Sequence, residues 1–224
     1  MVDFTMNINR YIIDQFKAIG IKNYKLKSLR EDLVNVSILQ EKMIRQSPRK
    51  VEFSKELEKH LDQNQGLKGM VNYLRLLLTN GTDVNCHQSK EVFNHHTPDP
   101  LVHHWKIYHL HLADARTKHR YFKDRTNELL FIYIDDSQAL FLNIFNHKPR
   151  ENFADIKLLE ILDNNWPEIL TVCNDIVGLS YELNNAERFN MRKHNFNEGI
   201  VNVNNKFVFT PNPGVASNGT TISA

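Results

Sequence analysis

The chain has 224 residues, of which 41% are hydrophobic, and its 28 basic and 26 acidic side chains leave a formal net charge of +2. This is the composition of an ordinary globular protein that can build a sizeable core. The only two cysteines, Cys86 and Cys173, are far apart in sequence, which fits a reducing cytoplasm better than a disulfide framework and excludes a four-cysteine zinc site. The charge permits a nucleic-acid partner without requiring one.

Nothing in the sequence indicates export or a membrane. No apolar run approaches the ~18 residues that a membrane-spanning helix needs. The N-terminus also lacks a basic region followed by an apolar one, as a signal peptide would have. We therefore expect a soluble, cytoplasmic protein with no membrane partner.

Residues 1–82 are predicted to form a helical layer, because apolar residues recur there at helical spacing. Ser54 is a suitable N-cap, and the Asn80-Gly81 pair is a typical turn. The predicted helices cover residues 8–19, 26–45, 54–61 and 67–79. Such a layer normally buries its apolar face against a core, although the face at residues 70–78 could instead bind a protein partner.

Residues 103–148 are predicted to form a small antiparallel sheet, because the apolar pattern there changes to a period of two. The predicted strands cover residues 105–112, 129–134 and 140–145. The connection at residues 135–138 is short enough for a hairpin. Alternation places His109 and His111 on one face of the first strand, opposite Leu110.

The last predicted strand has two faces as well. Leu140, Leu142 and Ile144 should share one face, and Asn143 and His147 the other. If this strand is the neighbour of the first one, Asn143 and His147 can meet the two histidines in one polar pocket. A slip of one residue in register would separate them.

Residues 149–210 are predicted to form two helices and a hairpin, and residues 211–224 a flexible tail rich in small polar residues. The helices are expected at residues 152–162 and 167–181, the second starting at Pro167. The hairpin is expected at residues 199–210, turning at Asn204-Asn205. Together the elements predict a single α+β domain with N-terminal helices, a central antiparallel sheet, and C-terminal helices with a hairpin.

Eight of the eleven histidines fall between His87 and His119, so we expect the functional site there. Imidazole titrates near neutral pH and is a common nitrogen ligand of transition metals. A metal site is one interpretation. His109 and His111 form an HxH pair that could share an ion, with a third ligand from His147, Asp114 or Cys86. Zinc would suit such ligands, in a metal-binding protein or a metal-dependent phosphodiesterase.

Metal-free RNA cleavage is the second interpretation. Attack by a 2′-hydroxyl needs a base, an acid and cations for the charge on phosphorus. His109 and His111 are the candidate base and acid, and His147 is the alternative. The candidate phosphate-binding cations are Arg116, Arg120 and Lys148. Aromatic side chains among these residues could stack on an unpaired base, and the candidates are Trp105, Tyr108, Tyr121 and Tyr133.

Residues 105–148 resemble small bacterial messenger-RNA interferase toxins of the RelE and HigB types. The likeness lies in a short strand that ends in a basic loop, followed by the paired strands of LLFIYIDDSQALFLNIFNHK. It implies metal-free RNA cleavage and an antitoxin as protein partner, and it nominates Arg116, Arg120, His147 and Lys148. The chain departs from that family in its length, its HxH strand and its long flanking helices.

A third interpretation is a protein-interaction module without enzymatic activity, in which the histidines are structural and the helical layer binds a partner. The three interpretations differ in what the histidines must do. We favour a toxin-like ribonuclease or RNA-binding protein, with His109, His111 and His147 at the site. Activity in the presence of a chelator would separate it from the metal-dependent alternative.

Overall fold

The structure is a computed structural model that describes residues 4–18, 21, 23–115, 121–194 and 196–211. The α-helices of this part of the chain are α1 (Phe4–Ala18), α2 (Leu29–Lys42), α3 (Lys55–Gln63), α4 (Gln65–Thr79), α5 (Pro100–Trp105), α6 (Lys157–Asn165) and α7 (Asn185–Lys193). Its strands are β1 (Lys50–Phe53), β2 (Ile107–His111), β3 (Glu128–Ile134), β4 (Gln138–Asn146), β5 (Thr171–Val172), β6 (Ile200–Val203) and β7 (Lys206–Phe209). Short 3₁₀ turns are η1 (Asn85–His87), η2 (Lys90–Phe93), η3 (Arg150–Ala154) and η4 (Pro167–Ile169).

The predicted α+β class is confirmed. A four-stranded sheet has the order β1-β4-β3-β2, in which β1 is parallel to β4 and the other pairs are antiparallel. A smaller antiparallel sheet has the order β5-β7-β6. The predicted hairpins are present, and Asn204 and Asn205 turn the second one with φ angles of 50° and 63°, as a two-residue hairpin turn requires.

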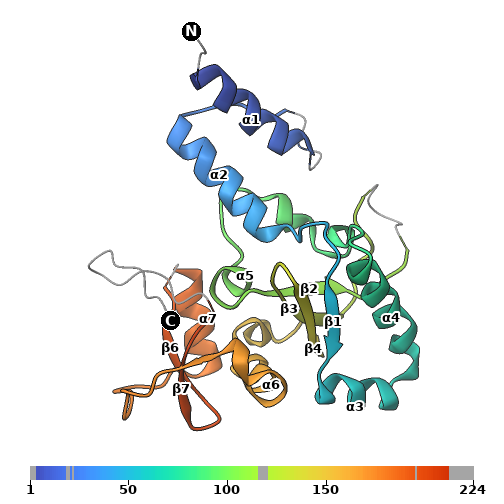
Figure 1. Ribbon diagram of the computed structural model, residues 1–224, viewed down its shortest axis with the longest axis vertical. Coiled ribbons are helices and arrows are strands. Elements are labelled where there is room, and N and C mark those ends of the chain that lie inside the picture. The colour runs from blue at the N-terminus through green and yellow to red at the C-terminus, as the bar shows by residue number, and fades with distance from the viewer. Residues whose placement is uncertain (1–3, 19–20, 22, 116–120, 195, 212–224) are drawn as a thin grey trace.

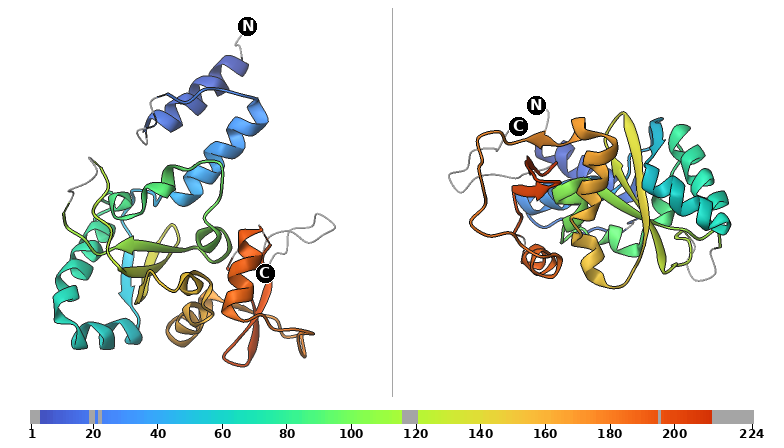
Figure 2. Two further views of the ribbon diagram at one scale, coloured as in Figure 1. Left: turned by 180° about the vertical axis from the view of Figure 1, so that it is seen from behind. Right: turned by 90° about the horizontal axis from the view of Figure 1, so that it is seen from below.

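The four-stranded sheet lies between two apolar layers (Figure 1; Figure 2, right). Helices α3 and α4 cover one face, where Leu57, Leu74 and Leu78 pack on Leu110 and Phe141. Helices α5 and α6 and the smaller sheet cover the other face, in a cluster around Trp105, Phe131, Leu158 and Val203. The apolar face predicted at residues 70–78 is therefore largely used in packing on the sheet.

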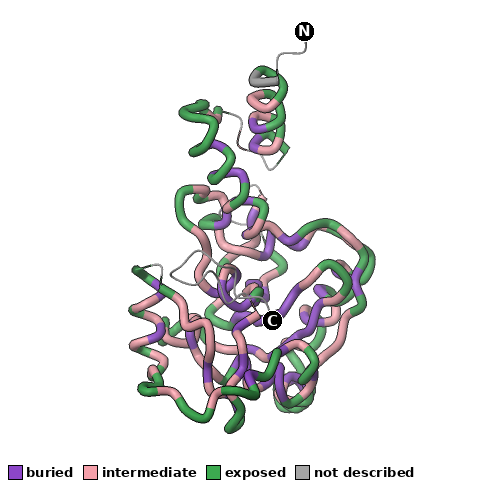
Figure 3. Tube along the Cα trace, turned by 60° about the vertical axis from the view of Figure 1, so that its left-hand side comes forward, coloured by how far each residue is buried: buried purple, intermediate pink, exposed green. Residues whose placement is uncertain are grey.

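Helices α1 and α2 project from this body as a pair (Figures 1 and 3). Their contact is a separate small cluster in which Ile12 and Phe16 of α1 meet Val36 and Leu39 of α2. The C-terminal half of α2 then runs into the body, where it contacts α5 and η2. No helix in the described ranges is long and apolar enough to cross a membrane.

Local signals in the first half predicted several boundaries correctly. Ser54 caps α3, because its Oγ accepts the backbone N–H of Leu57 at 3.0 Å. The turn after α4 contains Gly81 with φ of 68°, where a Cβ would lie 2.6 Å from the nitrogen of Pro48. Glycine is the residue that fits this turn, both for its backbone angle and for its lack of a side chain.

The predicted helix at residues 167–181 is wrong. Pro167 starts only the short turn η4, after which Thr171 and Val172 form β5 against β7. The apolar residues that looked helical are divided, since Leu170 joins the core while Val177 is fully exposed. Pairing with a strand nearly forty residues away overrides the local pattern here. The helix predicted at residues 152–162 is also displaced, because η3 precedes α6.

The faces predicted for β4 are partly wrong, because a bulge interrupts the strand. Phe131 pairs with Asn143 and Ile132 with Phe141, so Leu142 has no partner on β3. The extra residue reverses the alternation. Ile144 therefore packs with Phe141 on the α3–α4 side, while Leu142 packs on the opposite side.

Candidate functional site

The two histidines of the HxH pair lie on β2, at the edge of the four-stranded sheet within the described chain. Both lie on the sheet face opposite Leu110, as predicted, because side chains alternate along a strand. His109 packs beside Phe131 of β3 and meets the ring of Phe153 edge-on, with ring centres 5.0 Å apart. The His109 ring therefore packs against aromatic side chains and does not lie in open solvent.

His147 contacts the same aromatic side chain, Phe153, but not through the strand pairing that was predicted. His147 follows β4, and β4 is not the neighbour of β2, because β3 lies between them. Asn143 accordingly stays beside Phe131 and does not line the cavity described below. His147 follows the end of β4, where its backbone N–H donates to the carbonyl of Asn127 at 2.6 Å. Its ring meets Phe153 edge-on at 5.6 Å.

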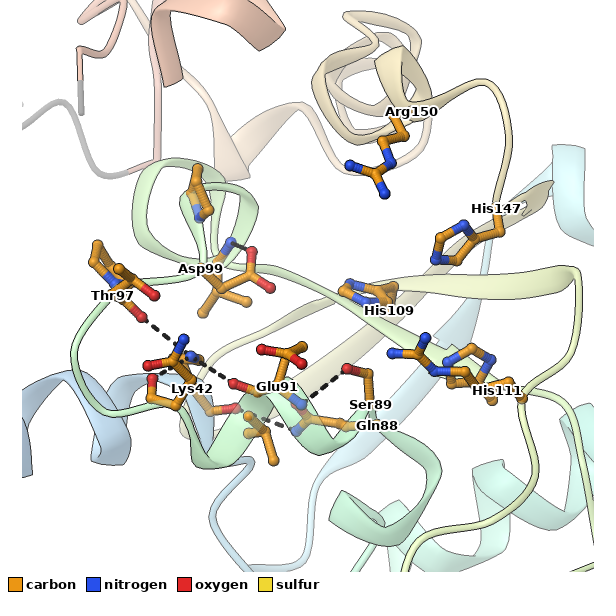
Figure 4. A pocket seen from close by; sticks show the side chains of 16 residues that line it. Lys42, Gln88, Ser89, Glu91, Thr97, Asp99, His109, His111, His147 and Arg150 are labelled. Atoms are coloured by element: carbon orange, nitrogen blue, oxygen red, sulfur yellow. Dashed lines mark hydrogen bonds between the residues drawn. The ribbon is translucent and has the colours of Figure 1, made fainter. Parts of the chain in front are cut away.

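These histidines line an open cavity of about 480 Å³. Its walls come from the segment that contains η1 and η2, the start of α5, β2, Arg125 and the connection from β4 to η3. The polar residues that line it are Lys42, Gln88, Ser89, Glu91, Asn94, Thr97, Asp99, His109, His111, Arg125, His147 and Arg150. Figure 4 shows the imidazoles of His109 and His147 near each other, with the Arg150 guanidinium directed towards them and the Asp99 carboxylate towards His109.

The wall opposite the histidines is held by Lys42, near the C-terminal end of α2. Its buried Nζ donates to the carbonyl oxygens of Glu91, Asn94 and Thr97 at 2.9, 2.8 and 3.1 Å. Asp99 completes this wall by capping α5, since its Oδ1 accepts the backbone N–H of Leu101 at 3.0 Å. Lys42 therefore shapes the cavity, and its three donors are already used.

The surroundings keep the cavity histidines neutral at pH 7. Burial lowers the pKa of His109, and Arg125 and a protonated His147 lower it further, against the opposing effect of Asp99. Burial also lowers the pKa of His147, with added effects of Arg125 and Arg150. His109 Nδ1 is buried and has no hydrogen-bond partner among the described residues. A neutral imidazole of this kind can accept a proton from a bound ligand.

His111 differs from the other two because it is 1% exposed. Its Nδ1 accepts the backbone N–H of Thr126 at 3.1 Å, and its carbonyl accepts a hydrogen bond from His87 Nδ1 at 3.1 Å. Burial is the main reason why its pKa falls to about 4. His111 is thus fixed as a neutral ring that ties β2 to its neighbouring segments.

Neither of the predicted phosphate-binding residues that the structure describes, Lys148 and Tyr133, lines the cavity. Lys148 is exposed and lies outside the cavity lining. Tyr133 was predicted to bind nucleic acid, but it is 6% exposed in the core, where burial raises its pKa to about 12. Arg116 and Arg120 lie outside the described residues. The arginines that do line the cavity are Arg125 and Arg150.

Sequence reasoning missed both of these arginines for the same reason. Arg125 lies in the charged stretch before β3, and Arg150 follows Pro149, so each is in a connection without periodicity. Several histidines of the cluster also have structural contacts away from the cavity. His103 Nδ1 contacts Glu41 at 2.8 Å, and His95 packs edge-on against Phe16 at 5.1 Å. The density of histidines in the sequence therefore overstates the size of the site.

The residues considered as metal ligands do not converge. In the part of the chain that the structure describes, no group of three or more His, Cys, Asp or Glu side chains is placed to hold a metal ion. Of the third ligands considered, Asp114 pairs with Lys123 at 2.9 Å, and Cys86 is buried in η1. His147 shares the cavity with His109, but the two do not form part of such a group.

Comparisons with protein-family models, with curated proteins and with solved structures found no match for this chain. The arguments below therefore rest on the geometry and chemistry of the cavity.

Proposed function

We propose that the cavity binds a phosphodiester of single-stranded RNA and cleaves it without a metal ion. The observation that carries this proposal is the pair of neutral imidazoles, His109 and His147, that both meet the Phe153 ring edge-on in a cavity also lined by Arg125 and Arg150. Two imidazoles and two guanidiniums supply the base, acid and charge stabilisation that attack by a 2′-hydroxyl needs.

Burial and charge suggest different roles for the two histidines. His109, beside the Asp99 carboxylate, is the proposed base that removes the proton from the 2′-hydroxyl. His147 is next to Arg125 and Arg150, where a bound phosphate would place negative charge, and that charge favours the protonated ring. His147 is therefore the proposed acid that protonates the departing 5′ oxygen. The products would be a 2′,3′-cyclic phosphate and a free 5′-hydroxyl.

His111 takes a supporting part in this scheme. Because its Nδ1 already accepts from Thr126 and its ring is buried, we assign it the positioning of β2 rather than proton transfer. His109 and His111 were the predicted base and acid, whereas His109 and His147 take these two roles in the proposal. A toxin-like role with an antitoxin as partner stays a prediction from the resemblance.

Cleavage of a partly single-stranded RNA by untagged protein in EDTA tests the proposal. The variants are His109→Ala and His147→Ala, and His60→Ala on α3 is the matched control, since it lies outside the cavity lining. We expect cleavage in EDTA by the parent and the control, with a loss of about 100-fold or more in each cavity variant. The 2′,3′-cyclic phosphate should be detectable by mass spectrometry.

Three outcomes would overturn the proposal. Absence of cleavage under all conditions would leave an RNA-binding protein or an interaction module as the better account. Cleavage only with an added divalent cation would favour a metal-dependent phosphodiesterase. Equal cleavage by the parent and both cavity variants would place any activity outside this cavity.

A further inference from the structure

A second site is indicated by a buried guanidinium, that of Arg192 on α7, which is 3% exposed. Its Cζ lies 3.9 Å from the ring centre of Trp105, and its Nη1 donates to the carbonyl of Phe153 at 2.9 Å. Its Nε and Nη2, and the Nε1 of Trp105, are buried and have no hydrogen-bond partner among the described residues. Two stacked side chains thus leave three buried nitrogen atoms without a hydrogen-bond acceptor among the described residues.

Arg188, one turn earlier on the same helix, shows how a buried arginine is satisfied in this protein. Its Nε pairs with Glu198, and its Nη2 donates to the carbonyl of Leu183 at 2.9 Å. Its Nη1 donates to the carbonyl of Ala154 and to the side chain of Asn185 at 3.2 and 3.0 Å. Arg192 lies on the same helix and is similarly buried, but its guanidinium makes only one hydrogen bond among the described residues, to the carbonyl of Phe153.

The charge of Arg192 is also poorly compensated. Burial is the main reason why its pKa falls to about 9; the charge of Arg188 also lowers the pKa, and Glu198 and Asp99 offset only part of the effect. His104 lies close enough that the charge of Arg192 lowers its pKa. A buried charge without a partner costs several kcal/mol, so a site of this kind is expected to gain an anion.

A cavity of about 170 Å³ adjoins the guanidinium. It is lined by Arg192 and Lys193 of α7, by Phe153 and Phe189, and by Pro100, Leu101 and the preceding Asp99 at the start of α5. The Nζ of Lys193 lies over the Phe189 ring at 4.5 Å and adds a second positive charge at this rim. Adjacent Nε–H and Nη2–H donors form the fork that binds two oxygens of one phosphate or carboxylate group.

The small cavity neighbours the histidine cavity. Asp99 and Pro100 line both cavities. Phe153 lines the small cavity, and its ring also contacts the rings of His109 and His147. A ligand with two phosphate groups could therefore occupy both sites, with Phe153 between them.

We infer that the Arg192 cavity is a phosphate subsite, in which the Nε–Nη2 edge binds two oxygens of a phosphate monoester and Lys193 adds a second cation. The monoester can be free in solution or be the 5′ phosphate of an RNA strand. Only the second source rests on the proposed function, because phosphate binding at Arg192 does not depend on cleavage at the histidines.

Calorimetric titration with inorganic phosphate tests the subsite. An Arg125→Gln/Arg150→Gln background removes the cations of the histidine cavity, so the remaining binding reports on Arg192. In this background we expect Arg192→Met to weaken phosphate binding by at least about ten-fold, since a bidentate, charge-assisted pair is lost. Arg192→Lys should give an intermediate affinity, and Arg30→Met, an exposed change on α2, should have no effect.

Stability in phosphate-free buffer provides a second readout. Replacing an unpaired buried charge by an apolar side chain of similar length is often neutral or stabilising. Arg192→Met should therefore melt no lower than the parent without phosphate and should lose the rise in melting temperature that phosphate gives the parent. Equal phosphate affinity of the parent, the Met variant and the Lys variant would overturn the subsite.

Two RNA strands of one sequence, with a 5′ phosphate or a 5′ hydroxyl, then distinguish the source. Tighter binding of the phosphorylated strand, abolished by Arg192→Met, would assign the subsite to the RNA end. Equal binding of both strands, with phosphate binding at Arg192 retained, would assign it to a free phosphate monoester. Failure of RNA cleavage alone would remove the proposed function and leave this subsite standing.

Discussion

Two neighbouring histidines on α5 show how surroundings decide the charge of a side chain in this protein. His103 donates to Glu41 at 2.8 Å, and this hydrogen bond raises its pKa. The pKa of His104 falls to about 3, mainly because of burial and in smaller part because of the charges of Arg192 and His103. At mildly acidic pH, one ring is therefore protonated and its neighbour is neutral.

These opposite shifts predict opposite effects of pH on stability. Between pH 6.5 and about 3, unfolded His104 binds a proton that folded His104 does not, so acid lowers the free energy of unfolding. The slope for one such group is about 1.4 kcal/mol per pH unit. His104→Gln should flatten the decline measured by urea unfolding from pH 6.5 to pH 4.

His103→Gln is the matched control for that experiment, because its contribution has the other sign. Its raised pKa stabilises the folded state fully below the unfolded value, and this stabilisation is lost as pH rises through the folded value. From pH 6.5 to pH 4 this stabilisation is nearly constant, so removing it should lower the free energy of unfolding without flattening the decline. Identical slopes for both variants would contradict the surroundings described for the two rings.

At this scale, part of the site was predictable from sequence. The shared face of His109 and His111 follows from alternation, which is a local property of a strand. His147 was nominated for the wrong reason, since the loop after β4 places it at the cavity and β3 separates it from β2 in the sheet. Arg125 and Arg150 depend on how irregular connections fold, and such segments carry no periodic signal.

Among the elements, the contact between α2 and the segment of residues 88–99 is the one that shapes the cavity. The regular structure in this segment is the short turn η2, so its shape depends on tertiary contacts. Lys42 supplies three of them from the end of α2. A single buried ammonium thus replaces the regular backbone pairing that the segment lacks.

Lys42→Met should therefore loosen this segment. The change leaves three carbonyl oxygens without their charged donor, and we expect the free energy of unfolding to fall by about 3 kcal/mol. Hydrogen exchange should rise in residues 88–99 more than in β3. Lys90→Met, an exposed change within the same segment, is the control and should leave both measurements unchanged. Uniform loosening of the whole chain by Lys42→Met would contradict this local role.

The elements that sequence reasoning missed have little local signal. β1 has only four residues, and its parallel partner β4 is far away in sequence, since Lys50 pairs with Gln138. α7 is mainly polar, and its start at Asn184 depends on a reciprocal cap with Glu187. By contrast, α2, α4 and the strands β2 to β4 combine a clear period with caps or turns, and their existence was predicted correctly.

On the scale of the whole molecule, the α1–α2 pair is separate from the sheet and its two apolar layers. The buried residues at their contact form a cluster of their own. Links to the body among the described residues include α2 itself and the edge-on contacts of His95 with Phe16 and Tyr24 at 5.1 and 5.3 Å. α1 is accordingly placed to open without disturbing the sheet.

Phe16→Ala and Phe131→Ala test this division, because both side chains are fully buried but in different clusters. Truncating a buried phenylalanine costs about 3–5 kcal/mol where the surroundings unfold together. Phe131 packs beside His109, so its variant should lower the cooperative melting temperature and weaken the cavity. Phe16→Ala should raise hydrogen exchange in α1 while β3 keeps its protection and the main melting transition stays in place. A matching loss of protection in β3 would show that α1 unfolds with the sheet and that the molecule is one cooperative unit.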